Sequence, residues 1–128
     1  MSDRRLLLVE DEFLIRLTLA ETLADDGFEV VEADSADSAL AALAAEGEIA
    51  MMLTDIQLPG GLNGRALAAK AREGRPGLPV VFMSGAVDEA PSGHPLDHYI
   101  HKPYSPAAVS NAVRRILGHD RDRGPPAS

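Results

Sequence analysis

One short stretch, Leu6-Leu7-Leu8-Val9-Glu10-Asp11, decides the fold hypothesis, because two carboxylates directly follow four apolar residues. A continuous apolar run without alternation is typical of a strand buried on both faces of a parallel sheet. The run is too short for a membrane span or for the core of a signal peptide. It therefore predicts an α/β protein with a parallel sheet, and it makes the residues that follow each strand the first candidates for function.

Apolar runs and helical patterns alternate along the rest of the chain. Further strands are predicted at 28–31, 49–53, 79–83 and 99–101. Helical spacing of apolar residues runs from 13 to 24, and helices are also predicted at 36–46, 64–73 and 106–117. Ser35 and Ser105 are the predicted N-caps, and Pro106 suits a first helical position. This alternation predicts right-handed βαβ crossovers and one parallel sheet covered on both faces.

Two segments fit the pattern less well. Pro91, Gly93 and Pro95 interrupt the segment 87–96, so any helix there is expected to be short or distorted. Residues 119–128 are polar and rich in proline, so we expect a disordered tail after a domain at 1–118.

Length and composition narrow the class of protein. The chain has 128 residues, which suits one domain with its own core. The absence of cysteine excludes disulfides, zinc thiolates and a cysteine nucleophile. A formal net charge of −8 argues against nucleic-acid binding and against docking on an anionic membrane. A cytoplasmic location is the default expectation.

Chemically active side chains follow the strands of the predicted sheet. They are Glu10, Asp11, Asp55, Ser84 and Lys102. In open parallel sheets, ligands bind outside the carboxyl ends of the strands, so these side chains are expected to meet at one edge. Two like charges about 4 Å apart repel by roughly 4 kcal/mol at an effective dielectric constant of about 20. A divalent cation would relieve this repulsion, and an all-oxygen site suits Mg²⁺ or Mn²⁺.

Such a site suits phosphoryl transfer, which depends mainly on positioning and charge neutralisation. Asp55 is the predicted in-line nucleophile, and Lys102 and the Ser84 hydroxyl are expected to bind phosphoryl oxygens. Each residue also has a simpler interpretation. Asp55 could cap a turn, and Ser84 could cap a helix. The functional interpretation is favoured because chemically active residues follow several strands of the same predicted sheet.

The strand-end motifs together resemble the receiver domain of two-component response regulators. The resemblance is to receiver domains of the chemotaxis-regulator type. The motifs are Leu6–Asp11, Asp55 followed by Pro59 and Gly64, Met83-Ser84-Gly85, and Lys102-Pro103. The resemblance extends from residue 4 to about residue 118. It implies a flavodoxin-like, doubly wound, five-stranded parallel sheet of strand order 2-1-3-4-5.

The resemblance also implies roles for single residues. Asp11 and Asp55 would bind Mg²⁺ directly, Glu10 would act through water, and the backbone carbonyl of Gln57 would be a further ligand. Tyr99 matches an aromatic residue whose rotation is coupled to movement of Ser84, although a tyrosine in a strand is more often a packed residue with a solvated hydroxyl. The Lys102–Pro103 peptide bond is expected to be cis.

The implied function is that of a phosphoacceptor, not of an enzyme. A histidine kinase or a histidine phosphotransfer protein would supply the phosphoryl group, and a downstream protein partner would recognise the switched surface. Met1 and the irregular tail favour a free-standing protein, and a receiver cut from a hybrid kinase is the alternative. The loop Gly60–Gly64 is one residue longer than the usual pattern.

Three other hypotheses fit the sequence less well. A small Mg²⁺-dependent phosphatase would carry a second acid two residues after its nucleophile, where this chain has Gln57. A flavodoxin-like module that binds a small anion would not explain Asp55 and Lys102 together. The four histidines could suggest a transition metal, but their spacing fits no tight ligand set.

Overall fold

The computed structural model describes residues 4–60, 62–85 and 94–118. Within them, a single sheet contains five parallel strands in the order β2-β1-β3-β4-β5. The strands are β1 (Arg5–Val9), β2 (Glu29–Ala33), β3 (Met51–Asp55), β4 (Val80–Ser84) and β5 (Asp97–His101). The helices are α1 (Phe13–Asp25), α2 (Ala36–Ala45), α3 (Gly64–Gly74) and α4 (Pro106–Leu117). The predicted flavodoxin-like α/β fold and its strand order are confirmed.

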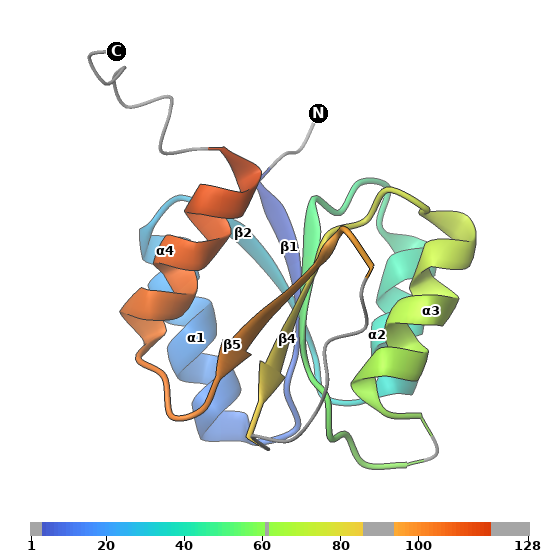
Figure 1. Cartoon of the computed structure of the whole chain (residues 1–128), viewed down its shortest axis with the longest axis horizontal. Coiled ribbons are helices and arrows are strands. Elements are labelled where there is room, and N and C mark those ends of the chain that lie inside the picture. The colour runs from blue at the N-terminus through green and yellow to red at the C-terminus, as the bar shows by residue number, and fades with distance from the viewer. Residues whose placement is uncertain (1–3, 61, 86–93, 119–128) are drawn as a thin grey trace.

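The sheet separates two apolar layers. Helices α1 and α4 cover one face, and α2 and α3 cover the other (Figure 1). Leu6 and Leu8 of β1 point into the layer under α1 and α4, whereas Leu7 and Val9 point into the layer under α2 and α3. All four side chains have no exposed surface. The uninterrupted apolar run that opens the sequence is therefore buried on both faces, as its pattern predicted.

Strand β2 begins one residue later than the sequence predicted. The Phe28 amide donates a 3.1 Å hydrogen bond to the carbonyl of Leu23, at the end of α1. Gly27, between them, has a φ of 99°, in the left-handed region that glycine reaches without a steric penalty. The backbone of Phe28 is therefore used to end the helix, and strand pairing starts at Glu29.

Strand β3 extends two residues beyond its predicted end. Thr54 and Asp55 are paired with Phe82 and Met83 of β4, so both belong to the sheet. The Thr54 hydroxyl also donates to the Asp55 carbonyl at 2.9 Å. Asp55 is consequently the last residue of a central strand, and its backbone is fixed before any chemistry at its side chain.

Side chains cap three of the helices where the sequence turns. Ser35 accepts from the Ser38 amide at 3.1 Å, and the Ser38 hydroxyl completes a capping box. Ser105 accepts from the Ala108 amide at the start of α4, as predicted. At α3, Asn63 has this role. These caps satisfy amides that have no partner inside the helix.

Three sequence predictions concern residues outside the described ranges. The short or distorted helix of 87–96 falls largely on 86–93, the disordered tail is 119–128, and the longer glycine loop includes residue 61. Across the described residues, no helix combines the length and the apolar character needed to cross a lipid bilayer.

Gly64 starts α3 in close contact with the end of β3. Its amide donates a 2.7 Å hydrogen bond to the Ile56 carbonyl. A Cβ atom at this position would lie 2.1 Å from the carbonyl oxygen of Asp55. Since that oxygen belongs to backbone held in the sheet, it cannot move aside. Only glycine fits, and the contact fixes the first turn of α3 against the end of β3.

Gly64→Ala should therefore lower the free energy of unfolding, by about 1–3 kcal/mol as is usual for overpacking. Chemical denaturation of both proteins measures this change. Gly74→Ala, at the other end of α3, is the control because its added Cβ meets no atom within 4 Å. That control should be neutral or stabilising by about 0.4–1 kcal/mol. Equal stabilities of Gly64→Ala and the wild type would contradict the close contact.

Candidate functional site

Three carboxylates meet at the carboxyl edge of the sheet. Glu10 and Asp11 follow β1, and Asp55 ends the neighbouring strand β3. One carboxylate oxygen from each residue lies within 4.8 Å of the others. Glu10 and Asp55 are buried, whereas Asp11 is exposed. The cluster therefore has buried acidic walls and a side open to solvent, which suits a small cation that also binds a ligand from solution.

The Glu10 side chain is only 1% exposed. Its Oε2 accepts a 3.0 Å hydrogen bond from the Glu12 amide. Its buried Oε1 accepts no hydrogen bond from any of the described residues. Burial, followed by a hydrogen bond with Asp55, raises the pKa of Glu10 to about 8. A buried acceptor without a donor is costly, so this oxygen is well placed for a proton or a metal ion.

Lys102, the residue after β5, brings a positive charge to the acidic cluster. Its Nζ lies 3.0 Å from Oδ1 of Asp55, and its side chain is 38% exposed. Burial alone would lower the pKa of Lys102, but the hydrogen bond and charge of Asp55, with the charges of Glu10 and Glu12, together raise it. The ammonium group therefore stays protonated. The Lys102–Pro103 peptide bond is cis, as the resemblance implied.

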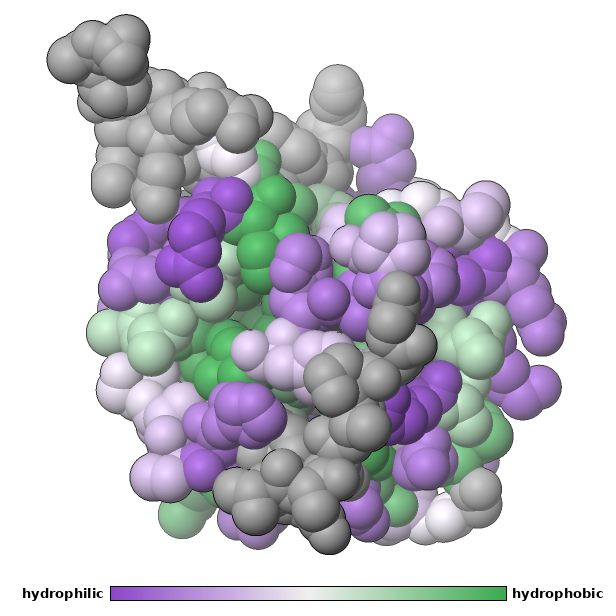
Figure 2. All heavy atoms as spheres, in the orientation of Figure 1, coloured by the Kyte–Doolittle hydropathy of each residue, from purple (hydrophilic) through white to green (hydrophobic). Residues whose placement is uncertain are grey.

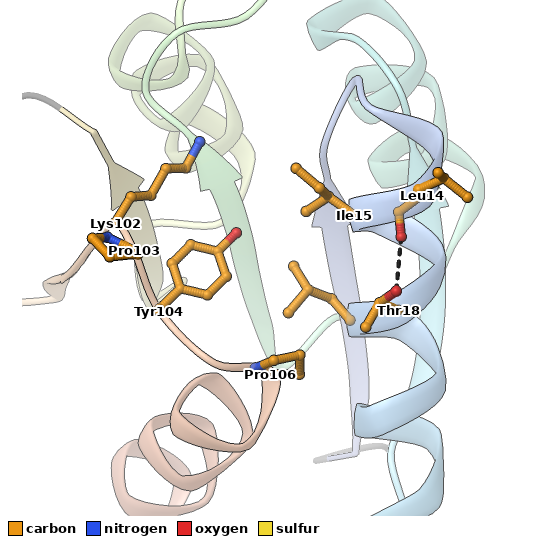
Figure 3. Close-up of a pocket in the computed structure, with 8 residues that line it drawn as sticks. Leu14, Ile15, Thr18, Lys102, Pro103, Tyr104 and Pro106 are labelled. Atoms are coloured by element: carbon orange, nitrogen blue, oxygen red, sulfur yellow. Dashed lines mark hydrogen bonds between the residues drawn. The ribbon is translucent and has the colours of Figure 1, made fainter.

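A groove of about 510 Å³ lies beside this site, between α1 and the segment after β5. It is lined by Leu14, Ile15, Thr18, Leu19, Lys102, Pro103, Tyr104 and Pro106. Figure 3 shows the Tyr104 ring pointing across the groove toward α1. Phe13 and Leu14 are 60% and 71% exposed, the large apolar side chains that are most open to solvent among the described residues. The site thus borders an apolar surface, and Lys102 belongs to both.

The other predicted site residues follow or lie in neighbouring strands of the sheet. Ser84 ends β4, opposite His101 of β5. Gln57 is exposed on the loop that follows Asp55. Tyr99 lies within β5 and stacks on Phe82, with ring centroids 5.3 Å apart. The structure therefore brings together Glu10, Asp11, Asp55 and Lys102, and the roles of the others stay predictions.

Three residues near the site escaped sequence analysis. Arg16 donates a 2.9 Å hydrogen bond to the Glu10 carbonyl and so holds the acidic loop in place. Tyr104 follows Pro103, and burial together with the charges of Asp55, Glu10 and Glu12 raises its pKa to about 12. Arg65 of α3 donates to the Tyr99 hydroxyl at 3.1 Å. The sequence did contain one signal for Arg65. A cation in the first turn of a helix is unfavourable because of the helix dipole, so an arginine there suggests another role.

The fold and the site together define a class, a doubly wound α/β domain with an acidic site at the carboxyl ends of its central strands. The family model of the response regulator receiver domain matches residues 6–114. The chain therefore belongs to the receiver domain family of response regulators. Domains of this family are signalling domains of two-component systems, and the family includes the receivers of hybrid kinases.

Several relatives support this assignment. The chain is 36% identical to the response regulator protein FleR of Pseudomonas aeruginosa over 115 residues, which are 87% of the chain and 24% of FleR. It is 32% identical to the aerobic respiration control protein ArcA of Escherichia coli over 129 residues, 97% of the chain and 52% of ArcA. The chain thus spans about a quarter of one relative and about half of the other.

Solved structures agree with the sequence relatives. A response regulator receiver protein from Sinorhizobium medicae superposes with a TM-score of 0.80 at 32% identity, over 89% of this chain and 94% of that chain. The receiver domain of the hybrid histidine kinase CckA superposes with a TM-score of 0.75 at 31% identity, over 88% and 98% of the two chains.

Burial of Glu10 makes the stability of the metal-free protein depend on pH. The pKa of Glu10 is raised to about 8 in the folded chain, whereas a glutamate carboxyl exposed to water has a pKa of 4.5. Stability should therefore be highest below the lower value and fall as the pH rises toward the upper one, by up to ~1.4 kcal/mol per pH unit from this group. Denaturant unfolding with a chelator, from acid to about pH 8, measures the slope.

Glu10→Gln should flatten this slope because it removes the titrating proton. Glu21→Gln, which changes an exposed carboxylate on α1, should leave the slope as in the wild type. A wild-type slope in Glu10→Gln would show that another group controls the pH dependence.

Proposed function

We propose that Asp55 accepts a phosphoryl group from a phosphohistidine donor and so switches a protein-binding face of the domain. One observation carries the proposal. The Asp55 carboxylate is buried at the end of β3, between the acidic residues that follow β1 and the Lys102 ammonium group 3.0 Å away. Lys102 is thus within reach of a group attached to Asp55. Family membership supports the same role.

The carboxylates fit a magnesium ion. All of the candidate ligand atoms are oxygens, and the buried Oε1 of Glu10 accepts no hydrogen bond from the described residues. Mg²⁺ prefers oxygen ligands and keeps several waters, which suits a site with one open side. We assign Asp11, Asp55 and the Gln57 carbonyl as ligands, with Glu10 acting through water. When bound, Mg²⁺ would neutralise charge on the phosphoryl oxygens, and Mn²⁺ could replace it.

The transfer step is a substitution at phosphorus. A carboxylate oxygen of Asp55 forms the new P–O bond while the N–P bond of the donor breaks. The electron pair of that bond stays on the imidazole nitrogen, which then takes up a proton. Lys102 stabilises one phosphoryl oxygen, and the Ser84 hydroxyl is the proposed partner of another. The acceptor chain thus supplies positioning and charge, which dominate phosphoryl transfer.

The modified residue carries about −1.5 to −2 units of charge, enough to reorganise nearby hydrogen bonds. We propose that the change passes through Ser84 and Tyr99 to the surface of β5. A groove of about 410 Å³ lies there, lined by Val81, His98, Tyr99, Ile100, Ala112, Arg115 and Ile116. Figure 2 shows apolar side chains between α4 and β5 on this face. A downstream protein partner would bind in this groove. Because a histidine kinase uses ATP, we propose that the protein acts in the cytoplasm.

The direct test is intact mass after incubation with Mg²⁺ and acetyl phosphate. The wild type should gain one phosphoryl group, and Asp55→Asn should gain none, because asparagine lacks the nucleophilic carboxylate. A chelator should suppress the gain. No gain in the wild type, or an equal gain in Asp55→Asn, would refute the proposal. Rapid multiple turnover of the donor would instead favour a small Mg²⁺-dependent phosphatase.

A protein donor must bring its phosphohistidine to Asp55, so its surface must lie close to Lys102. The groove that Lys102 shares with α1 is the apolar surface that continues from the site (Figure 3). We therefore propose that a helix of the histidine kinase or phosphotransfer protein binds there. Leu14, which is 71% exposed, is available as an apolar anchor.

Leu14→Ala should slow phosphorylation by a histidine phosphotransfer protein that phosphorylates the wild type, by roughly tenfold for a central apolar contact. Phosphorylation by acetyl phosphate should be unchanged, since a small donor needs no docking surface. Rapid-quench assays with both donors measure the two rates. Glu21→Ala, an exposed change about two turns further along α1, should behave as the wild type. Equal slowing with both donors would place the effect in the acceptor site instead.

A further inference from the structure

Arg65 connects α3 to the aromatic side chains of β4 and β5. Its guanidinium group donates a 3.1 Å hydrogen bond to the Tyr99 hydroxyl. It also lies 5.7 Å from the ring centroid of Phe82 and 5.6 Å from that of Tyr99. The two rings stack with an interplanar angle of 30°. A planar guanidinium is well suited to hydrogen-bond at its edge while it contacts aromatic faces.

The other end of this connection is the backbone of Asp55. Arg65 directly follows Gly64, whose amide is bound to the Ile56 carbonyl at 2.7 Å. The backbone of Gly64 is packed so closely on the Asp55 carbonyl that no side chain fits between them. The backbone that carries the Arg65 side chain is therefore packed directly against the end of β3.

We propose that Arg65 is a positioning residue, which ties Tyr99 to the first turn of α3 and so couples the phosphorylation state of Asp55 to the position of the Tyr99 ring. This inference rests on the proposed function of Asp55. Phosphorylation of Asp55 would then affect β5 in two ways, through Arg65 of α3 and through Ser84 as proposed above.

The proposed basis is a choice between two rotamers of the Tyr99 side chain, of which the structure shows one. The Tyr99 ring cannot change its χ1 rotamer without separating its hydroxyl from Arg65 and its face from Phe82. A hydrogen bond from a charged donor biases such an equilibrium by roughly tenfold or more. Coupling requires an element with two states whose balance is affected by both sites. The Tyr99 ring would meet this requirement through Arg65, which directly follows Gly64, whose backbone packs against the Asp55 carbonyl.

Fluorine NMR can follow this ring directly. The chain has two tyrosines and no tryptophan, so protein labelled with fluorotyrosine should give two resonances. A Tyr104→Phe sample assigns them. The probe is Mg²⁺ with beryllium fluoride, a stable mimic of a phosphoryl group on a carboxylate. The fluorine signal of the bound mimic reports occupancy of the site in the same spectrum.

In the wild type, saturation with the mimic should shift the Tyr99 resonance. In Arg65→Met, the equilibrium constant that favours the described position of Tyr99 should fall about tenfold, and most of the shift should be lost although the mimic still binds. Arg65→Lys should retain part of the response, because it keeps the charge but loses the planar fork. Lys70→Met is the matched control, since it removes an exposed cation from the same helix. It should respond as the wild type does.

A full shift of Tyr99 in Arg65→Met would overturn the inference. A double-mutant cycle with Tyr99→Phe gives a second criterion, because a specific contact predicts that the two changes are not additive. Additive effects on the affinity for the mimic would also overturn it. Failure of the proposed function would appear differently, as absence of a phosphoryl gain in the wild-type mass spectrum. In that case the Tyr99 resonance of ligand-free Arg65→Met still decides whether Arg65 holds the ring.

Discussion

The crowding of carboxylates at one edge of a parallel sheet is the constraint on which the rest of this structure depends. Because β1 and β3 are neighbours and run in the same direction, Glu10 and Asp11 must lie beside Asp55. Buried like charges repel, so the edge needs a compensating cation or a bound proton. Lys102, just after β5, supplies part of that compensation. Burial raises the pKa of Glu10, so without a metal ion a proton on Glu10 would relieve part of the remaining repulsion.

Much of the fold was predictable because its signals are local. Apolar runs, serine caps and helix-ending glycines each act over a few residues, and the rule for strand ends then converts sequence order into proximity. The sequence alone therefore predicts that Asp55 and Lys102 lie at one edge of the sheet. It missed strand bounds by one or two residues, because the ends depend on pairing partners. The Phe28 amide closes α1, while Asp55 pairs with Met83.

The polar contacts between helices and strands could not be predicted, since they join residues far apart in the sequence. Arg72 of α3 forms a partly buried 2.7 Å ion pair with Asp97 at the start of β5. Arg75 donates to the Leu43 carbonyl in α2 at 2.8 Å. With Arg65, these arginines connect α3 to three other elements. Their long side chains reach partners that no periodicity identifies, and only the three-dimensional arrangement distinguishes them from solvated surface charges.

The tight contact at Gly64 is a packing constraint, whereas the carboxylate at position 55 is a chemical constraint. A sequence comparison alone would not distinguish the two. The atom that excludes a side chain there is the main-chain carbonyl oxygen of residue 55, and every amino acid has one. A degenerate copy of this domain that had lost its acidic acceptor would still require glycine at position 64. Persistence of that glycine during evolution therefore reports the architecture alone, whereas the carboxylate at position 55 reports whether the copy still signals.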